Sequence, residues 1–175
     1  MGYGTWFTGH LNLEKKLSSH HLAYLQAFSE TQHVQWNADL LQDEPDPLRE
    51  AVGLPLGENG CYFTGRSFKE HYSYPPWQYE GTETDPAYLG AVCPGKPDHY
   101  CAWMPDEDGA KLVIASDKPY GYLTWLRYLI EHFFLPWGYS LNGEMTWQGE
   151  EEDDTEMISV KNNVIIVHQA PQADE

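Results

Sequence analysis

The alternation of apolar and polar positions predicts strands at both ends of the chain. Residues 3–13 place their apolar side chains at a period of two, which is the spacing of a strand with one buried face. Residues 139–148 repeat this alternation, and apolar residues at 158–160 and 164–168 flank the turn pair Asn162-Asn163. We therefore expect an N-terminal strand and, near the C-terminus, one strand followed by a hairpin.

A spacing of three and four residues predicts two longer helices. Apolar residues recur in this way between residues 119 and 134, so we expect a helix there, with Asp117 as its N-cap and Pro136 ending it. Residues 18–29 begin with two serines suited to an N-cap and continue with an apolar helical pattern. This segment is the first predicted helix.

Shorter elements fill the middle of the chain. The patterns predict a strand at 33–36 and helical turns at 38–41 and 47–52. They also predict a turn at 58–60 that leads into a strand candidate at 61–64. A hairpin is expected to pair residues 100–104 with 112–114. Between residues 66 and 98 no period persists, although aromatic residues are frequent. We expect a long irregular excursion there that packs down on the protein.

The order of these elements predicts the fold class. Strand, helix, strands, helix and strands in succession favour an α+β fold, in which an antiparallel sheet has two main helices packed on one face as a two-layer sandwich. The 175 residues, 41% of them hydrophobic, match the common size of one domain. We therefore expect residues 1–175 to form a single domain, with its excursion at about 66–98. The hairpin spacing excludes a doubly wound parallel sheet.

The net charge of the chain limits the kinds of molecule that it can bind. Ten Lys and Arg against 27 Asp and Glu give a net charge of −17, which repels nucleic-acid phosphates and anionic lipid and attracts basic surfaces. No apolar run reaches the roughly 18 residues of a membrane span, and the first ten residues lack the pattern of a secretory signal. The three cysteines fit a reducing compartment. We expect a cytoplasmic protein that binds neither nucleic acid directly nor membrane.

The acidic run near the C-terminus is the strongest chemical feature. Residues 137–159 hold seven acids and no Lys or Arg. These acids are Glu144, Glu150, Glu151, Glu152, Asp153, Asp154 and Glu156. One interpretation is a solvated loop that keeps the protein soluble. The other is a negative surface that docks on a basic groove and imitates the phosphates of duplex nucleic acid. Trp77, which follows two prolines, is the candidate aromatic anchor for such a partner.

No motif selects a reaction, a metal or a cofactor. Residues 106–109 lack the ligand alternation of a calcium loop, and the cysteines lack the spacing of a zinc site. Glycine-rich phosphate loops are absent from the sequence. We therefore predict no cofactor and no catalytic residue. The alternative is a small-ligand-binding protein or an enzyme with an aromatic-lined cleft, using His71, His99 or Cys101. A structural part of an oligomer is a third alternative.

Two stretches carry a resemblance to a known group of proteins. Residues 45–55 (PDPLREAVGLP) and the segment from Trp125 to Trp147, especially PWGYSLNGE at 136–144, resemble a largely uncharacterised family of small acidic proteins of bacteriophages and mobile elements. Where these relatives tend to place glycine after the paired acids, this chain has Thr155-Glu156. The resemblance implies a phage-type setting, in which small acidic proteins often inhibit host defence complexes. It supplies no catalytic residue.

These features favour a binding protein over an enzyme. We expect the seven acids and Trp77 to bind a basic surface on a nuclease or a CRISPR-type complex in the host cytoplasm. The sequence leaves open the identity of the partner, the oligomeric state and whether the acidic patches share one face.

Overall fold

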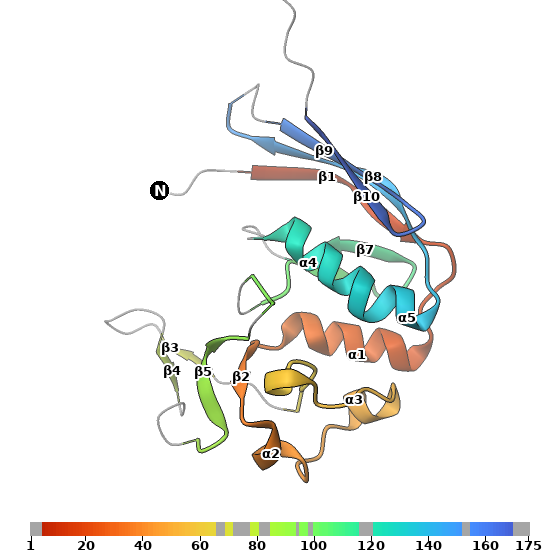
Figure 1. The fold of residues 1–175 in the computed structure, drawn as a ribbon. Helices are drawn as coiled ribbons and strands as arrows, with labels where there is room; N and C mark the ends of the chain where they lie inside the picture. The colour runs from red at the N-terminus through yellow and green to blue at the C-terminus, as the bar shows by residue number, and fades with distance from the viewer. Residues whose placement is uncertain are drawn as a thin grey trace, which may run out of the picture. The chain divides into compact units, whose positions relative to one another are not determined.

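The chain forms two compact units, of which one is discontinuous in sequence. The computed structural model describes residues 5–65, 69–71, 78–80, 85–93, 95–97, 100–115, 121–151 and 155–169. Unit 1 comprises Met1–Ser18 and Ala102–Glu175, and unit 2 comprises Ser19–Cys101 (Figure 1). Unit 2 is thus inserted into the sequence of unit 1. The expectation that the whole chain behaves as one domain stays a prediction.

Unit 1 is built on a six-stranded antiparallel sheet with the strand order β10-β9-β8-β1-β7-β6. The strands are β1 (Thr5–Leu13), β6 (Trp103–Pro105), β7 (Lys111–Ile114), β8 (Leu141–Gly149), β9 (Thr155–Lys161) and β10 (Val164–Gln169). Every one of the five neighbouring pairs is antiparallel. The predicted N-terminal strand, the β6–β7 hairpin and the β9–β10 hairpin around Asn162-Asn163 are confirmed. Both asparagines adopt a positive φ, as a tight hairpin turn requires.

The ladder between β1 and β8 is the longest in the sheet, and two glycines permit its close backbone approach. Its register runs from Thr5 opposite Gly149 to Leu13 opposite Leu141. A Cβ on Gly9, where φ is +93°, would lie 2.5 Å from the carbonyl oxygen of Glu144. A Cβ on Gly143 would lie 2.8 Å from the carbonyl oxygen of His10. Any other residue at either position would push the two central strands apart.

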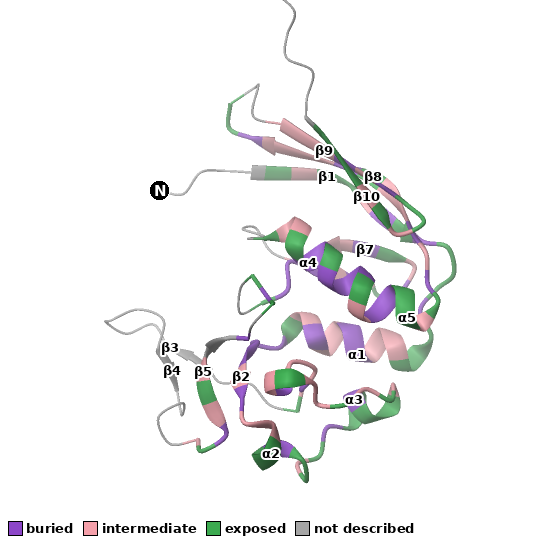
Figure 2. Ribbon diagram, in the orientation of Figure 1, coloured by how far each residue is buried: buried purple, intermediate pink, exposed green. Residues whose placement is uncertain are grey.

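The second predicted helix belongs to unit 1 and contacts its sheet. It comprises α4 (Tyr122–Leu129), a π-helical turn (η2, Ile130–Phe134) and α5 (Leu135–Trp137). At its start the Tyr122 ring packs edge-to-face on Phe7 of β1, and its carbonyl oxygen accepts a hydrogen bond from the Trp103 indole at 2.8 Å. Buried positions recur along one side of α4, as Figure 2 shows. The apolar periodicity therefore predicted the buried face.

The ends of this helix differ from the prediction. Gly121, in the left-handed conformation, precedes the first turn, and the expected cap Asp117 lies outside the described residues. Pro136 does not end the helix, which continues to Trp137 and stops at the left-handed Gly138. A proline removes a backbone donor and crowds the preceding turn. The wide π turn just before Pro136 accommodates both effects.

Unit 2 consists of short elements around the helix α1 (Ser19–Glu30). These elements are β2 (Val34–Trp36), α2 (Ala38–Leu41), α3 (Pro47–Ala51), η1 (Glu58–Gly60), β3 (Lys69–His71), β4 (Gln78–Glu80) and β5 (Tyr88–Val92). Strand β2 pairs antiparallel with β5, and β3 pairs antiparallel with β4. Helix α1, strand β2 and the turns α2 and α3 match the predicted segments.

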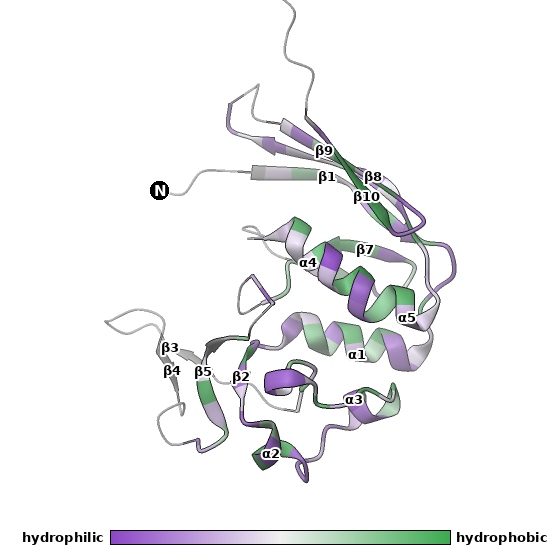
Figure 3. Cartoon of the chain, in the orientation of Figure 1, coloured by the Kyte–Doolittle hydropathy of each residue, from purple (hydrophilic) through white to green (hydrophobic). Residues whose placement is uncertain are grey.

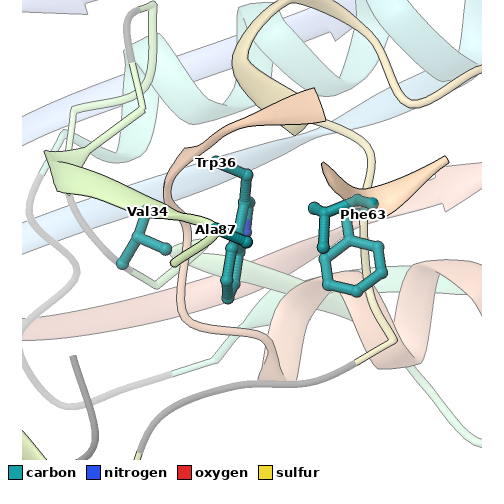
Figure 4. Close-up of a cluster of buried hydrophobic side chains, with 5 residues drawn as sticks. Val34, Trp36, Phe63 and Ala87 are labelled. Carbon is teal, nitrogen blue, oxygen red and sulfur yellow. The ribbon is translucent and has the colours of Figure 1, made fainter. Parts of the chain in front are cut away.

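A small hydrophobic cluster holds these short elements together. It contains Val34, Trp36, Leu41, Phe63 and Ala87 (Figure 4). The Trp36 and Phe63 rings meet edge-to-face with their centroids 5.3 Å apart, an arrangement that aromatic pairs prefer. Gly60 packs on this pair, because a Cβ there would lie 2.8 Å from the Cβ of Trp36.

Two expectations for unit 2 are corrected. Residues 61–64 form no strand, because η1 continues into a turn in which the Phe63 backbone N–H donates to the Gly60 carbonyl oxygen. Between 66 and 98, where no regular structure was expected, the structure has β3, β4 and β5. The last of these is bulged against β2, and a bulge breaks the period that would signal a strand.

The α+β class, the antiparallel sheet and the two main helices are therefore confirmed. Among the described residues, no helix combines the length and the apolar character needed to span a membrane.

Candidate functional site

The acidic residues predicted to bind a partner gather at and beyond strand β8. Glu144 lies within the strand, and Glu150 and Glu151 follow its end; all three residues are exposed. We call Glu144, Glu150 and Glu151 the β8 acids. Glu152, Asp153, Asp154 and Trp77 lie outside the described residues. The structure therefore places three of the eight predicted binding residues in solvent.

Glu156 is separated from the β8 acids by the pleat of the sheet. It stands opposite Trp147 in the β8–β9 ladder, whereas Glu144 stands opposite Ser159. Because side chains alternate between the two faces of a strand, Glu144 and Glu156 point to opposite faces. The Glu156 carboxylate accepts a hydrogen bond from the Tyr122 hydroxyl of α4. Burial, together with this bond, raises the pKa of Tyr122, so Glu156 serves the packing of unit 1.

Burial removes more positive than negative charge from the described surface. Arg49 and Lys96 are buried, and Asp46 is the buried acid among the described residues. Asp46 forms an ion pair with Arg49 at 2.9 Å and accepts hydrogen bonds from both the backbone and the hydroxyl of Thr64. This pair is satisfied within unit 2. Among the described residues, burial therefore increases the excess of acids over bases that remain at the surface.

Lys96 occupies a buried polar cluster in unit 2 that the sequence did not reveal. Its ammonium contacts the ring nitrogen Nδ1 of His33 at 3.0 Å and donates to the carbonyl oxygen of Cys61. The Phe28 ring lies beneath it, with the centroid 5.0 Å away. We call Phe28, His33, Cys61 and Lys96 the Lys96 cluster. It joins α1, the residue before β2, the residue after η1 and the loop after β5.

The partners of His33 fix its tautomer. Its Nε2 lies 2.9 Å from the carbonyl oxygen of Phe28, and a carbonyl can only accept, so Nε2 carries the proton. Nδ1 then has a free lone pair, which accepts from the Lys96 ammonium. A neutral His33 is thus held between one acceptor and one donor. This arrangement satisfies both ring nitrogens in a site where His33 is 3% exposed.

The surroundings of Lys96 favour its neutral form. Lys96 is 6% exposed, and its three contacts described above are to uncharged groups. Burial lowers the pKa of the Lys96 ammonium from 10.5 to about 8. Burial also raises the pKa of the nearby Cys93 thiol. A buried amine that titrates near neutral pH is a candidate functional group, although burial alone also produces such a shift.

The residues of the alternative hypothesis do not assemble into a described site. Cys101 is reduced and buried, as is common for a cysteine that packs as a small apolar residue. The His71 side chain and His99 lie outside what the structure describes. Within the described part of the chain, no group of three or more His, Cys, Asp or Glu side chains could hold a metal ion.

No pattern in the sequence indicated a contact between Lys96 and His33. They lie 63 residues apart, and neither belongs to a motif. The shortage of basic residues is the one hint, because a lysine flanked by Gly95 and Pro97 in so acidic a chain is itself uncommon. Burial of the side chain is decided by the fold, through the pairing of β2 with β5.

Comparison with family models, with curated proteins and with solved structures finds no match for this chain. The resemblance to phage proteins therefore stays a prediction. Functional arguments rest on the residues of this chain alone.

Proposed function

We propose that the protein is an acidic binding protein that occupies a basic site on a nucleic-acid-handling partner. The β8 acids form the described part of its binding surface, and Glu152, Asp153 and Asp154 extend that surface in sequence. In the phage-type setting that the resemblance implies, the partner is a host defence nuclease or a CRISPR-type complex. Binding blocks the groove that would otherwise hold nucleic acid.

The observation that carries this proposal is the exposure of carboxylates on a surface depleted of bases. Glu144, Glu150 and Glu151 are exposed, and residues 137–159, which include all three, contain no Lys or Arg. A strand rises about 3.3 Å per residue, so the six residue steps from Glu144 to Glu150 span about 20 Å. This length corresponds to about six base pairs of duplex, so the acids could occupy that length of a groove that binds nucleic acid.

The proposed mechanism is electrostatic steering followed by steric occupation. A strongly negative surface raises the encounter rate with a basic groove, and added salt screens that attraction. The association rate should therefore fall at least about tenfold between low and high salt. The dissociation rate should change much less, because it depends on the close contacts.

The test compares two variants that lose the same number of charges. The first carries Glu144→Gln, Glu150→Gln and Glu151→Gln, and the matched control carries Glu14→Gln, Glu107→Gln and Asp108→Asn, which are also exposed in unit 1. Both are used to capture partners from a bacterial lysate at low and high salt. We expect the β8 variant to lose a basic partner that the control retains.

The captured partner is then tested for competition. Duplex DNA should displace the wild-type protein from it, because both ligands use the same groove. Equal loss of binding in both variants would show that only total charge matters. Capture that is indifferent to salt, or a partner that still binds duplex DNA in the complex, would contradict the proposal.

A further inference from the structure

The two edges of the unit 1 sheet are protected to very different degrees. Strand β6 is three residues long and ends in Pro105, which has no backbone N–H to offer. Its Trp103 and Pro105 are buried. Strand β10 is six residues long, and among the described residues its outer edge pairs with no other strand. Short length and proline are common devices that protect an edge from pairing, and β10 lacks both.

Strand β10 exposes apolar side chains on both faces. Val164 is 61% exposed, Ile166 48% and Val167 39%. Val167 stands opposite the buried Ile158 of β9, while Val164 and Ile166 point to the other face. Figure 3 shows β10 as a strongly hydrophobic strand, and Figure 2 shows much of it as exposed. An edge of this composition is a template for strand addition.

Charge also distinguishes this edge from the rest of the protein. Residues 157–169 contain Lys161 and no Asp or Glu, in a chain with a net charge of −17. Two copies of such a chain repel each other, so they can approach closely only along acid-free surface. Strand β10 and its neighbour β9 beyond Glu156 provide that surface. We propose that β10 pairs with β10 of a second copy, which extends the sheet across a two-fold axis.

The distribution of charge along the hairpin favours the antiparallel arrangement. Lys161 lies at one end of the β9–β10 hairpin, and Glu156, opposite Gln169, lies at the other. Antiparallel pairing brings the Lys161 end of each copy toward the Glu156 end of its partner, whereas parallel pairing would bring the two acidic ends together. A two-fold axis perpendicular to the sheet keeps equivalent faces on the same side. Ile166 can then stand opposite Ile166 of the second copy.

This surface is independent of the β8 acids and responds oppositely to salt. Salt screens the repulsion between two acidic copies, so self-association should strengthen as salt is added. Partner binding through the β8 acids should weaken under the same change. The two proposals can therefore be refuted separately. A salt-dependent dimer that binds no basic partner would refute only the proposed binding function. A protein that binds a basic partner and stays a monomer would refute only the proposed dimer.

The experiment is sedimentation equilibrium of the full chain at low and high salt. We expect a monomer–dimer equilibrium that shifts toward dimer at high salt. Ile166→Lys places two like charges opposite each other and should weaken the dimer at least about tenfold. Leu40→Lys is the matched control, because Leu40 is 55% exposed in α2 and the same charge is added in unit 2. Val164→Lys repeats the test if Ile166→Lys fails to fold.

A cross-link tests the register directly. Opposed residues in an antiparallel pair have Cα atoms about 4.5–5.5 Å apart, a distance that a disulfide can span. Ile166→Cys should therefore form a covalent dimer with oxidised glutathione, and Leu40→Cys should not. A monomer at every salt concentration, or a dimer unaffected by Ile166→Lys and Val164→Lys, would overturn the proposal. A monomer that instead captures an extended basic peptide along β10 would also overturn it.

Discussion

The β8 acids and the Lys96 cluster place charged groups in opposite environments: the acids are exposed and Lys96 is buried. Glu144, Glu150 and Glu151 lie in solvent, where water and salt screen each charge and its removal changes little in the fold. Lys96 is buried against a histidine, a carbonyl and an aromatic ring. There each hydrogen-bond partner has a large effect on stability, because a buried charge without a partner raises the free energy of the folded state. The contacts of the buried Lys96 therefore matter for stability, whereas the three exposed carboxylates contribute little to it.

The largest effect is expected when the Lys96 cluster loses its histidine. His33→Ala removes one of the two acceptors described for the Lys96 ammonium and opens space beside Phe28, so the free energy of unfolding should fall by about 3 kcal/mol. Urea denaturation measures this loss. His20→Ala is the matched control, because His20 is exposed on α1 and its removal should cost less than about 0.5 kcal/mol. Equal losses in the two variants would contradict the importance of the cluster.

A smaller effect is expected from the titration of Lys96. Below pH 8 the ammonium is charged in both folded and unfolded chains, and the folded state bears the cost of burying it. Between about 8 and 10.5 the folded protein releases this proton while the unfolded chain keeps it, so this group makes the fold more stable as pH rises. Between pH 7 and 9 the gain should be about 1 kcal/mol.

The comparison of wild type with Lys96→Met isolates this contribution. Deprotonation of Cys93, whose pKa is raised by burial, favours the unfolded chain at higher pH and opposes the gain. Because the Lys96 charge lowers the pKa of the Cys93 thiol, this opposing effect is at least as large in Lys96→Met as in the wild type. The stability of the wild type relative to Lys96→Met should therefore increase from pH 7 to pH 9, as measured by urea denaturation. The same pH dependence in both proteins would refute the buried titration.

The smallest effect is expected from the β8 acids. Replacing Glu144, Glu150 and Glu151 by glutamine should change the free energy of unfolding by less than about 0.5 kcal/mol, because all three are exposed. Thermal unfolding at low salt checks this value in the variant used for partner capture. A large loss of stability would mean that these carboxylates hold the β8–β9 hairpin, which would remove the contrast with the Lys96 cluster.

Regular patterns in the sequence predicted the regular parts of the fold. The period-two alternation identified β1 and β8, and the asparagine pair identified the β9–β10 turn, because each depends only on neighbouring residues. Strand β5 was not predicted from the sequence because its pairing with β2 is interrupted by bulges. Pro136 was misread as a helix end because the π turn before it has no distinctive sequence pattern.

The sequence predicted which residues of the candidate site are charged, but it could not predict how their side chains are arranged. The acidic run marked Glu144, Glu150 and Glu151 as exposed, since charged runs are rarely buried. The different role of Glu156 depends on its register opposite Trp147 and on the approach of Tyr122, which only the folded sheet determines. Lys96 and His33 meet through the β2–β5 pairing, so no local pattern could reveal their contact.

The ladder between β1 and β8 also constrains the order in which the protein can fold during synthesis. Leu13 and its partner Leu141 are separated by 141 − 13 = 128 residues, and all of unit 2 is translated between them. Strand β1 therefore leaves the ribosome long before the strand that completes most of its hydrogen bonds. While translation continues, the inserted unit has its whole sequence available, and the sheet of unit 1 must wait for the last segments of the chain.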